Sequence, residues 1–496
     1  MTLPLPFLIA AFAAVILVAS SDPVEAHSTD ASLTEEQARQ DASILQRALK
    51  ELHPALTKYR TQAEMDAAFA RFDARAQSAR TASEMYLAAT QLAAAIRCGH
   101  TWTNVLNQEG ASKAALLESP DKLPMRITLA AGRWLVLSSA DPAIVVGDEV
   151  LSINGVPSKD IVSRMLPYLR ADGSSDGKRF RQLSHDRGDY SQMDIVWPLL
   201  SPPVEGRYAL QLRGRTGPVR MASVRAVTLA QRDAILAAQG FKPSREDWTF
   251  RIDGNVGTLT LPTFAFYRSS FDWSAFLSDS FARLEAQRVA NLVIDVRANE
   301  GGDGAIGGEV LSHLIRKPFD FTSSQTVSAY ERVPYDLARY LDTWDYSFFD
   351  RTGQVEKITE GTAAGKYRYT AGGDGKQTMV PAAAPYAGRT FILVGPENSS
   401  ASFQFALLAK QSGAATLVGQ RTGGNQRGLN GGHLAWVVLP NSGVAVDIPL
   451  LAGTYTSATP DASVTPDVEV STSFDALRVG RDLEMESVKR LIQSRR

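Results

Sequence analysis

The sequence of 496 residues contains one cysteine, Cys98, and this scarcity excludes two kinds of structure. An intrachain disulfide cannot form, and a zinc site built from cysteines is ruled out. The single thiol, in "RCGHT", is either a small packed side chain, as free cysteines generally are, or a reactive group. We expect the packed form.

Net charge is almost absent as well. Lys and Arg number 52 against 53 Asp and Glu, which gives a formal net charge of −1. This balance supplies no broad electrostatic attraction to nucleic acids or anionic membranes. With 44% hydrophobic residues the chain has the composition of a soluble globular protein, and its length allows two to four domains. We expect no nucleic-acid partner, no metal and no other cofactor.

Lys and Arg are also missing before the longest apolar run, Leu3–Ala19. "VEA" at 24–26 resembles a small-residue cleavage site, so residues 1–26 are predicted to be a secretory signal. The mature chain would then begin near His27 and be periplasmic or secreted. Because about 17 apolar residues is the lower limit for a membrane span, an uncleaved anchor is the alternative. Membrane association is expected only in that case.

Glycine is absent from residues 30–96, where Pro54 is the only proline. Apolar residues recur at helical spacing in "SILQRALKEL" and again in "ASEMYLAATQLAAAI". The pattern predicts an N-terminal helical region, residues 27–105, with about three helices.

Short strand-like runs replace this pattern in residues 106–200. "MRITLAAGRWLVL" predicts a hairpin around Ala131-Gly132, and Asn154-Gly155 is a strong turn signal between apolar runs. A helix capped near Ser158 is expected to follow. This segment resembles part of a PDZ-like module.

Residues 201–475 alternate strands with helices, which predicts an α/β layered core with a largely buried sheet. The expected strands are "YALQL", "NVGTLTL", "NLVIDV", "TFILVG", "ATLVG", "LAWVVL" and "VAVDIPL", and the expected helices cover 271–288, 304–315 and 402–412. Residues 317–388 are polar, aromatic and turn-rich, as expected of an insertion on that core. Residues 476–496 are predicted to form a C-terminal helix.

Four polar residues crowd one strand-to-helix junction of this core, in "GPENSSASFQFALLAKQSG" at 395–413. One interpretation is helix capping, because Ser or Asn at such a junction satisfies free backbone N–H groups. The other is that Ser400 is a nucleophile at a helix start, where the N–H of Ala401 can donate to an oxyanion.

Two further stretches can complete such a site. His100, in "CGHTW", follows a helical region and a glycine, and is either a loop histidine or a base that takes the serine proton. In "LVIDVRANEGGDGAIGG" a buried strand leads into a glycine-rich turn whose N–H groups can face a ligand. Its spacing fits neither a Walker loop nor the dinucleotide fingerprint, so an oxyanion-stabilising turn is favoured. Asp295 and Arg297 are interpreted as a structural ion pair that braces the turn.

The stretches "LVIDVRANEGG", "NSSASFQFALLAKQSGAATLVGQRTGGN" and "VTPDVEV", in this order, resemble the C-terminal processing (tail-specific) serine peptidases. The resemblance covers roughly 205–475 and implies a ClpP/crotonase-like core. It places the nucleophile at Ser400 and the oxyanion donors at Ala401 and the Gly301-Gly302 turn. Many members of this family also carry a PDZ-like module upstream.

The sequence departs from many family members at Asn425, where a Ser–Lys dyad would need lysine. The chain is more similar to the branch that contains the tricorn protease core and the interphotoreceptor retinoid-binding modules. Peptidases of that branch take a histidine from a Gly-His-Thr-like motif, which implies His100 as the general base. Asp461 is the nearest carboxylate to the expected orienting glutamate, whereas Asp467 of the "PD" motif is interpreted as structural.

These features predict an exported, metal-independent serine peptidase that acts on polypeptides or short peptides, with Ser400, His100 and Asp461 as catalytic residues. A non-catalytic protein that binds a peptide or hydrophobic ligand on the same core is one alternative. An esterase with the same machinery is another.

Overall fold

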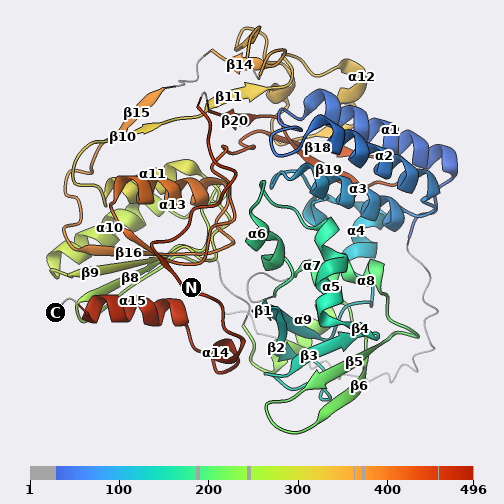
Figure 1. The fold of residues 1–496 in the computed structure, drawn as a ribbon, viewed down its shortest axis with the longest axis horizontal. Coiled ribbons are helices and arrows are strands. Elements are labelled where there is room, and N and C mark those ends of the chain that lie inside the picture. The colour runs from blue at the N-terminus through green and yellow to red at the C-terminus, as the bar shows by residue number, and fades with distance from the viewer. Residues whose placement is uncertain are drawn as a thin grey trace, which may run out of the picture.

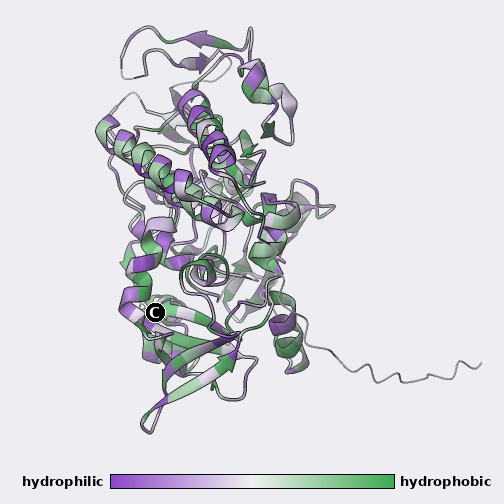
Figure 2. Cartoon of the chain, turned by 90° about the vertical axis from the view of Figure 1, so that its right-hand side faces the viewer, coloured by the Kyte–Doolittle hydropathy of each residue, from purple (hydrophilic) through white to green (hydrophobic). Residues whose placement is uncertain are grey.

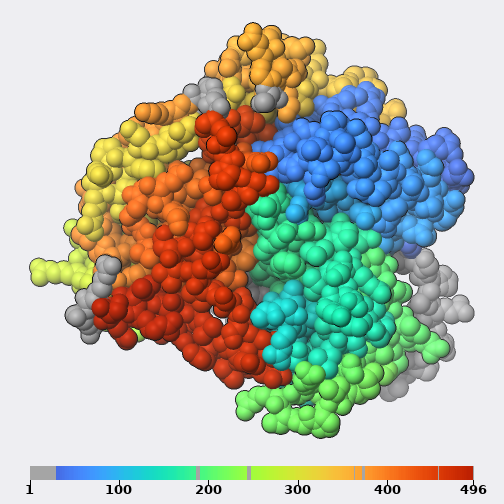
Figure 3. Space-filling view, in the orientation of Figure 1, coloured from blue at the N-terminus to red at the C-terminus, as the bar shows by residue number. Residues whose placement is uncertain are grey.

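The computed structural model describes residues 30–185, 190–242, 247–361, 363–370, 375–455 and 457–494. The predicted signal, residues 1–26, lies outside the described residues. Figure 1 shows the N-terminal helices and an antiparallel sheet on one side and an α/β half on the other. In the space-filling view of Figure 3 the two sides meet along a continuous boundary.

Three helices cover the glycine-free segment: α1 Glu35–Leu52, α2 Gln62–Ser78 and α3 Ala82–Ile96. The first two begin with capping boxes at Thr34 and Thr61, where the side chain accepts from the third helical residue and that residue's side chain accepts in return. Helix α3 ends at Arg97, whose φ of 62° lies in the left-handed region. The segment that contains His100 follows directly after this turn. The short helix α4, Gly110–Leu117, follows.

The next unit is an antiparallel sheet with strand order β1-β2-β3-β5-β6, in which β4 also pairs with β3. The predicted turns are present, since Ala131, Gly132, Asn154 and Gly155 all have φ between 50° and 76°. The strands are β1 Met125–Ala130, β2 Arg133–Ser139, β3 Glu149–Ile153, β4 Val156–Pro157, β5 Arg207–Arg213 and β6 Val219–Arg225. The helices of this unit are α5 Ser158–Met165, α6 Asp176–Arg181, α7 Gln192–Ile195, α8 Trp197–Leu200 and α9 Leu229–Ala238.

Two expectations for this unit are wrong. The structure places "YALQL" in β5, next to β3, so the boundary expected at residue 201 falls inside the sheet. The apolar face of β5 is buried in the same hydrophobic core as helices α1 to α3. Ser158 does not cap α5, because its hydroxyl donates to the Val150 carbonyl.

The α/β core contains a sheet of order β21-β17-β16-β9-β8-β7, parallel except for the β7–β8 pair. Its strands are β7 Thr249–Asp253, β8 Val256–Thr260, β9 Asn291–Asp295, β16 Arg389–Val394, β17 Thr416–Gly419 and β21 Val468–Glu469. Helices α10 Trp273–Ala286, α11 Gly304–Ser312 and α13 Ser400–Ser412 pack on one face, and α15 Leu483–Gln493 packs on the other (Figure 1). Burial on both faces explains why the central strands β9, β16 and β17 are continuously apolar over most of their length. The short helix α14, Phe474–Arg478, precedes α15.

The strands expected from "LAWVVL" and "VAVDIPL" exist, but they do not belong to this sheet. They are β18 Leu434–Val438 and β19 Ala445–Pro449, which form a separate sheet of order β12-β18-β19 with β12 Leu341–Asp342. Their side chains complete the core of the N-terminal helices instead. An apolar strand can face any core that the chain reaches, so its pattern alone did not assign the sheet.

The insertion, 317–388, forms small sheets at the top of Figure 1. Its further elements are β10 Phe319–Thr322, β11 Gln325–Ser328, α12 Tyr335–Ala338, β13 Val355–Lys357, β14 Tyr367–Tyr369 and β15 Lys376–Met379, and β11 pairs with β20 Ala452–Thr454. In Figure 2 the helices carry both hydrophilic and hydrophobic residues, as expected where one face is buried. Among the described residues, no helix combines the length and hydrophobicity that a membrane crossing requires.

Candidate active site

Ser400 lies where β16 turns into α13, as the sequence predicts. It is the first residue of the helix, and its φ of 50° is in the left-handed region. Such a conformation costs a non-glycine residue about 1–3 kcal/mol and persists only where the surroundings enforce it. The residue is partly exposed, and no hydrogen bond to its hydroxyl is found in the part of the chain that the structure describes. The strained backbone of Ser400 therefore presents a hydroxyl that makes no hydrogen bond to the described residues.

Neighbouring polar residues are engaged elsewhere, and none caps α13. The Ser399 hydroxyl donates to the Glu300 carbonyl at 3.1 Å, and the buried Ser402 hydroxyl donates to the Asn299 carbonyl at 2.7 Å. Asn398 also donates to the Asn299 carbonyl, at 3.0 Å. These bonds fasten the glycine-rich turn after β9 against the start of α13. The helix-capping interpretation of the serines is thus wrong.

The glycine-rich turn reaches Ser400 through Gly301, although Gly301 does not act as expected. Its φ of 126° favours glycine, and a Cβ there would lie 2.8 Å from the Cβ of Ser400. Its N–H donates to the Asn299 side chain at 2.8 Å and is unavailable to an oxyanion. Gly301 provides space for the serine, and its predicted role as a donor is wrong.

Gly302 and Ala401 keep their N–H groups free of protein acceptors among the described residues. Gly302 has a φ of 132°, and a Cβ there would lie 2.1 Å from the carbonyl carbon of Phe264, so only glycine fits. The bridge between Phe264 and Gly302 uses the N–H groups of Phe264 and Asp303 and leaves that of Gly302 unused. Two N–H groups of the kind an oxyanion needs are therefore free, one directly after Ser400 and one directly after Gly301, which contacts Ser400.

His100 follows the turn at the end of α3 and packs against Gly431. A Cβ at position 431 would lie 3.2 Å from Nε2 of the imidazole. The preceding residue, Gly99, is held on both sides: its N–H donates to the Asp172 carboxylate at 2.8 Å, and its carbonyl accepts from Arg170. Nδ1 of His100 is buried, and no hydrogen-bond partner for it occurs within the described ranges.

The imidazole is held in its neutral form. Burial lowers the pKa of His100 below the ordinary value of 6.5, and the positive charges of Arg170 and Lys178 add to the effect. The carboxylates of Asp172 and Glu300 act in the opposite direction and do not cancel it. A neutral imidazole at pH 7 can accept a proton, which is the state a general base requires.

Arg170 joins the two halves of the site, which are about 300 positions apart in the sequence. One guanidinium nitrogen donates to the Gly99 carbonyl next to His100. Another donates at 2.9 Å to the carboxylate of Glu300, the residue before the Gly301 turn. Lys178, which is buried, donates to the same carboxylate at 2.8 Å. No hydrogen bond joins His100 to Ser400 themselves in the described structure.

Asp461 does not take the place predicted for it. Its carboxylate accepts from the Ser174 N–H at 2.8 Å and from the Asn425 side chain at 2.7 Å, and among the described residues it makes no hydrogen bond to His100. Burial raises its pKa, but these hydrogen bonds outweigh burial and hold the pKa below its usual range. Asn425 is buried and links Asp461 to the 172–174 loop, so the position where lysine was expected is structural.

The other polar residues of the three stretches are structural too. Arg297 pairs with Asp295 at 2.7 Å and reaches Asp482 and Glu484 near the start of α15, which confirms the predicted ion pair. Asp467 pairs with Lys410 and accepts from the Leu417 N–H.

Cys98 is buried, and burial raises the pKa of its thiol, so the packed form expected of it is the one observed.

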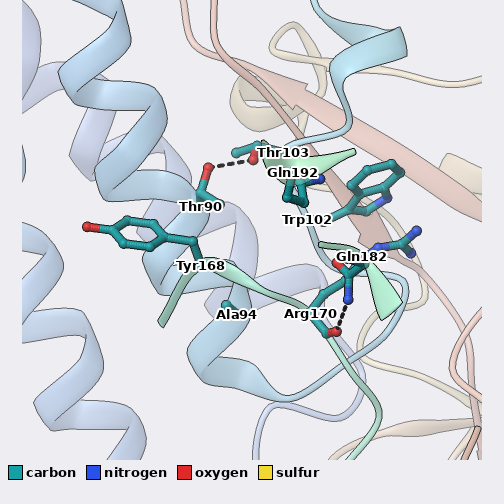
Figure 4. A pocket seen from close by; sticks show the side chains of 8 residues that line it. All are labelled: Thr90, Ala94, Trp102, Thr103, Tyr168, Arg170, Gln182 and Gln192. Carbon is teal, nitrogen blue, oxygen red and sulfur yellow. Dashed lines mark hydrogen bonds between the residues drawn. The ribbon is translucent and has the colours of Figure 1, made fainter. Parts of the chain in front are cut away.

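A small cavity next to helix α3, shown in Figure 4, is too small to hold a substrate. It is lined by Trp102, by Arg170, whose guanidinium lies 3.8 Å from the Trp102 ring centroid, and by Gln182, which donates to the Arg170 carbonyl. Its volume of about 10 Å³ holds one water at most. No cluster of three or more metal-binding side chains occurs among the residues described.

No local pattern indicates Arg170 and Asp172, because "LRADGS" matches no catalytic motif and both residues act through a fold-dependent contact with Gly99. Glu300 differs from them, because its position directly before the Gly301-Gly302 turn indicates a role at the site. A carboxylate directly before the Gly301-Gly302 turn is expected to lie near the groups that this turn contacts.

A strained serine between a strand and a helix, two free N–H groups and a neutral imidazole are together the features of an α/β serine hydrolase. Residues 255–470 match the model of Peptidase family S41. The chain carries a domain of this family and is a serine-type peptidase, a hydrolase. The family resemblance read from the motifs is confirmed.

Solved structures show how far the fold extends. Mature CPAF complexed with lactacystin is 16% identical with a TM-score of 0.61, over 92% of this chain and 98% of that chain. Mature CPAF alone gives a TM-score of 0.60, again at 16% identity, over 92% and 97% of the two chains. The photosystem II D1 C-terminal processing protease is 18% identical, with a TM-score of 0.38, over 88% and 94%. The two CPAF structures show a shared fold across nearly the whole chain. A search of curated proteins finds no match.

Proposed function

We propose that the protein is an exported serine peptidase in which Ser400 is the nucleophile and His100 the general base. The observation that carries this proposal is the pair of bonds from Arg170, to Gly99 beside His100 and to Glu300 beside the Gly301 turn. These bonds support a common site for the two predicted residues, because they link the neighbour of His100 to the turn that contacts Ser400. The S41 domain supplies the reaction class.

In the proposed reaction the Ser400 hydroxyl attacks a peptide carbonyl while His100 takes its proton. The oxyanion lies between the N–H groups of Ala401 and Gly302. His100 then gives the proton to the leaving amine, and water hydrolyses the acyl-enzyme by the same steps. Asp172 and Glu300 stabilise the transient imidazolium by charge, without a direct hydrogen bond.

The substrate class we propose is a polypeptide or short peptide. The β1–β6 unit is proposed to act as a PDZ-like module that adds an extended C-terminal segment along a sheet edge, as such modules do. Export rests on the apolar run Leu3–Ala19, which cleavage near residue 26 would remove from the mature chain.

A substrate panel tests the proposed function. The purified protein is expected to cleave peptides from a diverse library, and a fluorophosphonate probe is expected to label it at Ser400. Ester hydrolysis with no peptide cleavage would favour an esterase. Saturable binding of peptides without turnover or labelling would make the protein a binding protein and contradict the proposal.

The pH dependence of kcat/KM tests His100 and its carboxylates. Since burial lowers the pKa of His100, the acid limb of the profile is expected below pH 6.5. Asp172→Asn keeps an acceptor for the Gly99 N–H but removes a charge that raises this pKa. The limb should therefore move to lower pH, and kcat should fall about tenfold, equivalent to ~1.4 kcal/mol.

Asp461→Asn is the matched control for that measurement. Because Asp461 is bonded to Ser174 and Asn425, its charge should leave the acid limb unchanged. A shift in Asp461→Asn with none in Asp172→Asn would restore Asp461 as the orienting carboxylate.

A further inference from the structure

A second cavity lies close to the segment that leads to His100, since Arg97 contributes to its lining. A cavity of about 190 Å³ opens between helices α2 and α3 and the segment that leads into α6. Its floor is apolar and includes the buried side chains of Phe72 and Leu92. Its polar lining includes four arginines, Arg60, Arg71, Arg97 and Arg179, which come from separate parts of the chain.

The positive charge of this cavity is only half compensated. Among the described residues, the carboxylates that pair with the four arginines are Glu64, at 3.3 Å from Arg60, and Asp176, which is shared by Arg97 at 2.9 Å and Arg179 at 3.1 Å. Arg71 has neither an ion-pair nor a hydrogen-bond partner in the described structure. Two positive charges are left over around one cavity.

The arginines are close enough to act on one another. Burial lowers the pKa of Arg179, and the charges of Arg97 and Arg60 lower it further, whereas Asp176 raises it. Clustering like charges in this way is unfavourable unless an anion offsets it. The side chains of Arg97 and Arg179 are only 16% exposed, so solvent screens their repulsion incompletely.

We propose that this cavity binds a phosphate group, free or as a monoester. Phosphate carries about −1.5 to −2 charges at neutral pH, which matches the two uncompensated positive charges. Guanidinium groups bind its oxygens in paired, charge-assisted hydrogen bonds. The volume exceeds the ~10–15 Å³ that a single water requires and is below the ~300–1,000 Å³ of clefts for drug-sized ligands.

The site is separate from the peptidase machinery but shares a segment with it. Arg97 ends α3 three positions before His100, and its carbonyl accepts from the Gly173 N–H at 3.0 Å. Arg179 donates to the Leu169 carbonyl, directly before Arg170, at 3.2 Å. A bound phosphate would therefore connect two segments that also hold His100.

Calorimetric titration of the full chain with inorganic phosphate, glycerol 3-phosphate and malonate tests the proposal. We expect saturable binding of one phosphate or phosphomonoester per chain, with malonate, a dicarboxylate, at least tenfold weaker. Tighter binding of inorganic phosphate than of the monoester would identify free phosphate as the ligand, and the reverse would identify a phosphorylated molecule. Absence of saturable binding of both, or equal binding of malonate, overturns the proposal.

Two variants locate the site. Arg71→Gln removes a guanidinium that makes no hydrogen bond or ion pair among the described residues. The Tm without phosphate and the peptidase activity should therefore not change, while phosphate affinity should fall at least tenfold. Arg490→Gln, another exposed helical arginine, in α15, should bind phosphate like the wild type. If Arg71→Gln retains full affinity, or Arg490→Gln loses it, the assigned site is wrong. Neither result depends on whether Ser400 is the nucleophile.

Discussion

Ser400→Ala is expected to lower peptide hydrolysis by on the order of 10⁵–10⁶-fold, the size of loss seen when a serine peptidase loses its nucleophile. The melting temperature should stay nearly unchanged. The reason is that the Ser400 hydroxyl makes no hydrogen bond among the described residues, and alanine meets the same strained φ of 50°. Peptide turnover and thermal unfolding, measured on the same preparation, check both halves of this expectation.

Ser399→Ala is the matched control for the nucleophile. It removes a neighbouring hydroxyl that donates to the Glu300 carbonyl, a bond worth about 0.5–1.5 kcal/mol of stability. We expect a somewhat lower Tm and activity close to that of the wild type. If Ser399→Ala abolished turnover while Ser400→Ala preserved it, the nucleophile would be the other serine.

His100→Gln should reduce kcat/KM by roughly 10⁴-fold or more, because no other base is left to take the serine proton. The imidazole acts through its proton affinity, so added imidazole should restore part of the activity to a variant whose side chain leaves space, such as His100→Gly. Restoration of this kind would not follow if His100 only supported the fold. Fluorophosphonate labelling should slow in parallel with turnover.

His313→Gln serves as the control for the histidine. His313 follows α11, stacks on Phe281 with a centroid separation of 4.1 Å, and has a pKa that burial lowers, as it lowers that of His100. This variant should lose stability and keep its activity per folded molecule. Equal loss of activity in both variants would mean that His100 is no more than a structural histidine.

The parts of the site that local sequence could predict are those decided by local geometry. Ser400 follows an apolar strand and begins a helix, and such a junction exposes a side chain and the next N–H wherever the strand lies. Gly302 was predictable in the same way, because a glycine-rich turn after a strand allows the close backbone approach that Gly302 makes to Phe264. Three expected helices of the core, 271–288, 304–315 and 402–412, correspond to α10, α11 and α13.

The errors concern contacts between segments that are far apart in the chain. Gly301 was expected to donate to an oxyanion, but its N–H is used by Asn299, whose side-chain direction depends on the packing of the turn. Asp461 was expected beside His100 on the spacing of one motif. In the structure its carboxylate instead accepts hydrogen bonds from the Ser174 N–H and the Asn425 side chain. The expectation that strands β18 and β19 belong to the α/β core was wrong, because an apolar strand pattern does not indicate which other elements the strand packs against.

The sequence alone determined which reactive groups the chain carries and in what order. They are an early histidine, a glycine-rich turn and a serine at a helix start, with no lysine at Asn425. Each of these depends on residue identity and on neighbours a few positions away. Tertiary structure alone decided that Arg170 connects the two halves, that Asp172 and Glu300 supply the negative charge near His100, and that four arginines surround one cavity. Charge acts through space over several ångströms, and only the folded chain fixes which charges come that close.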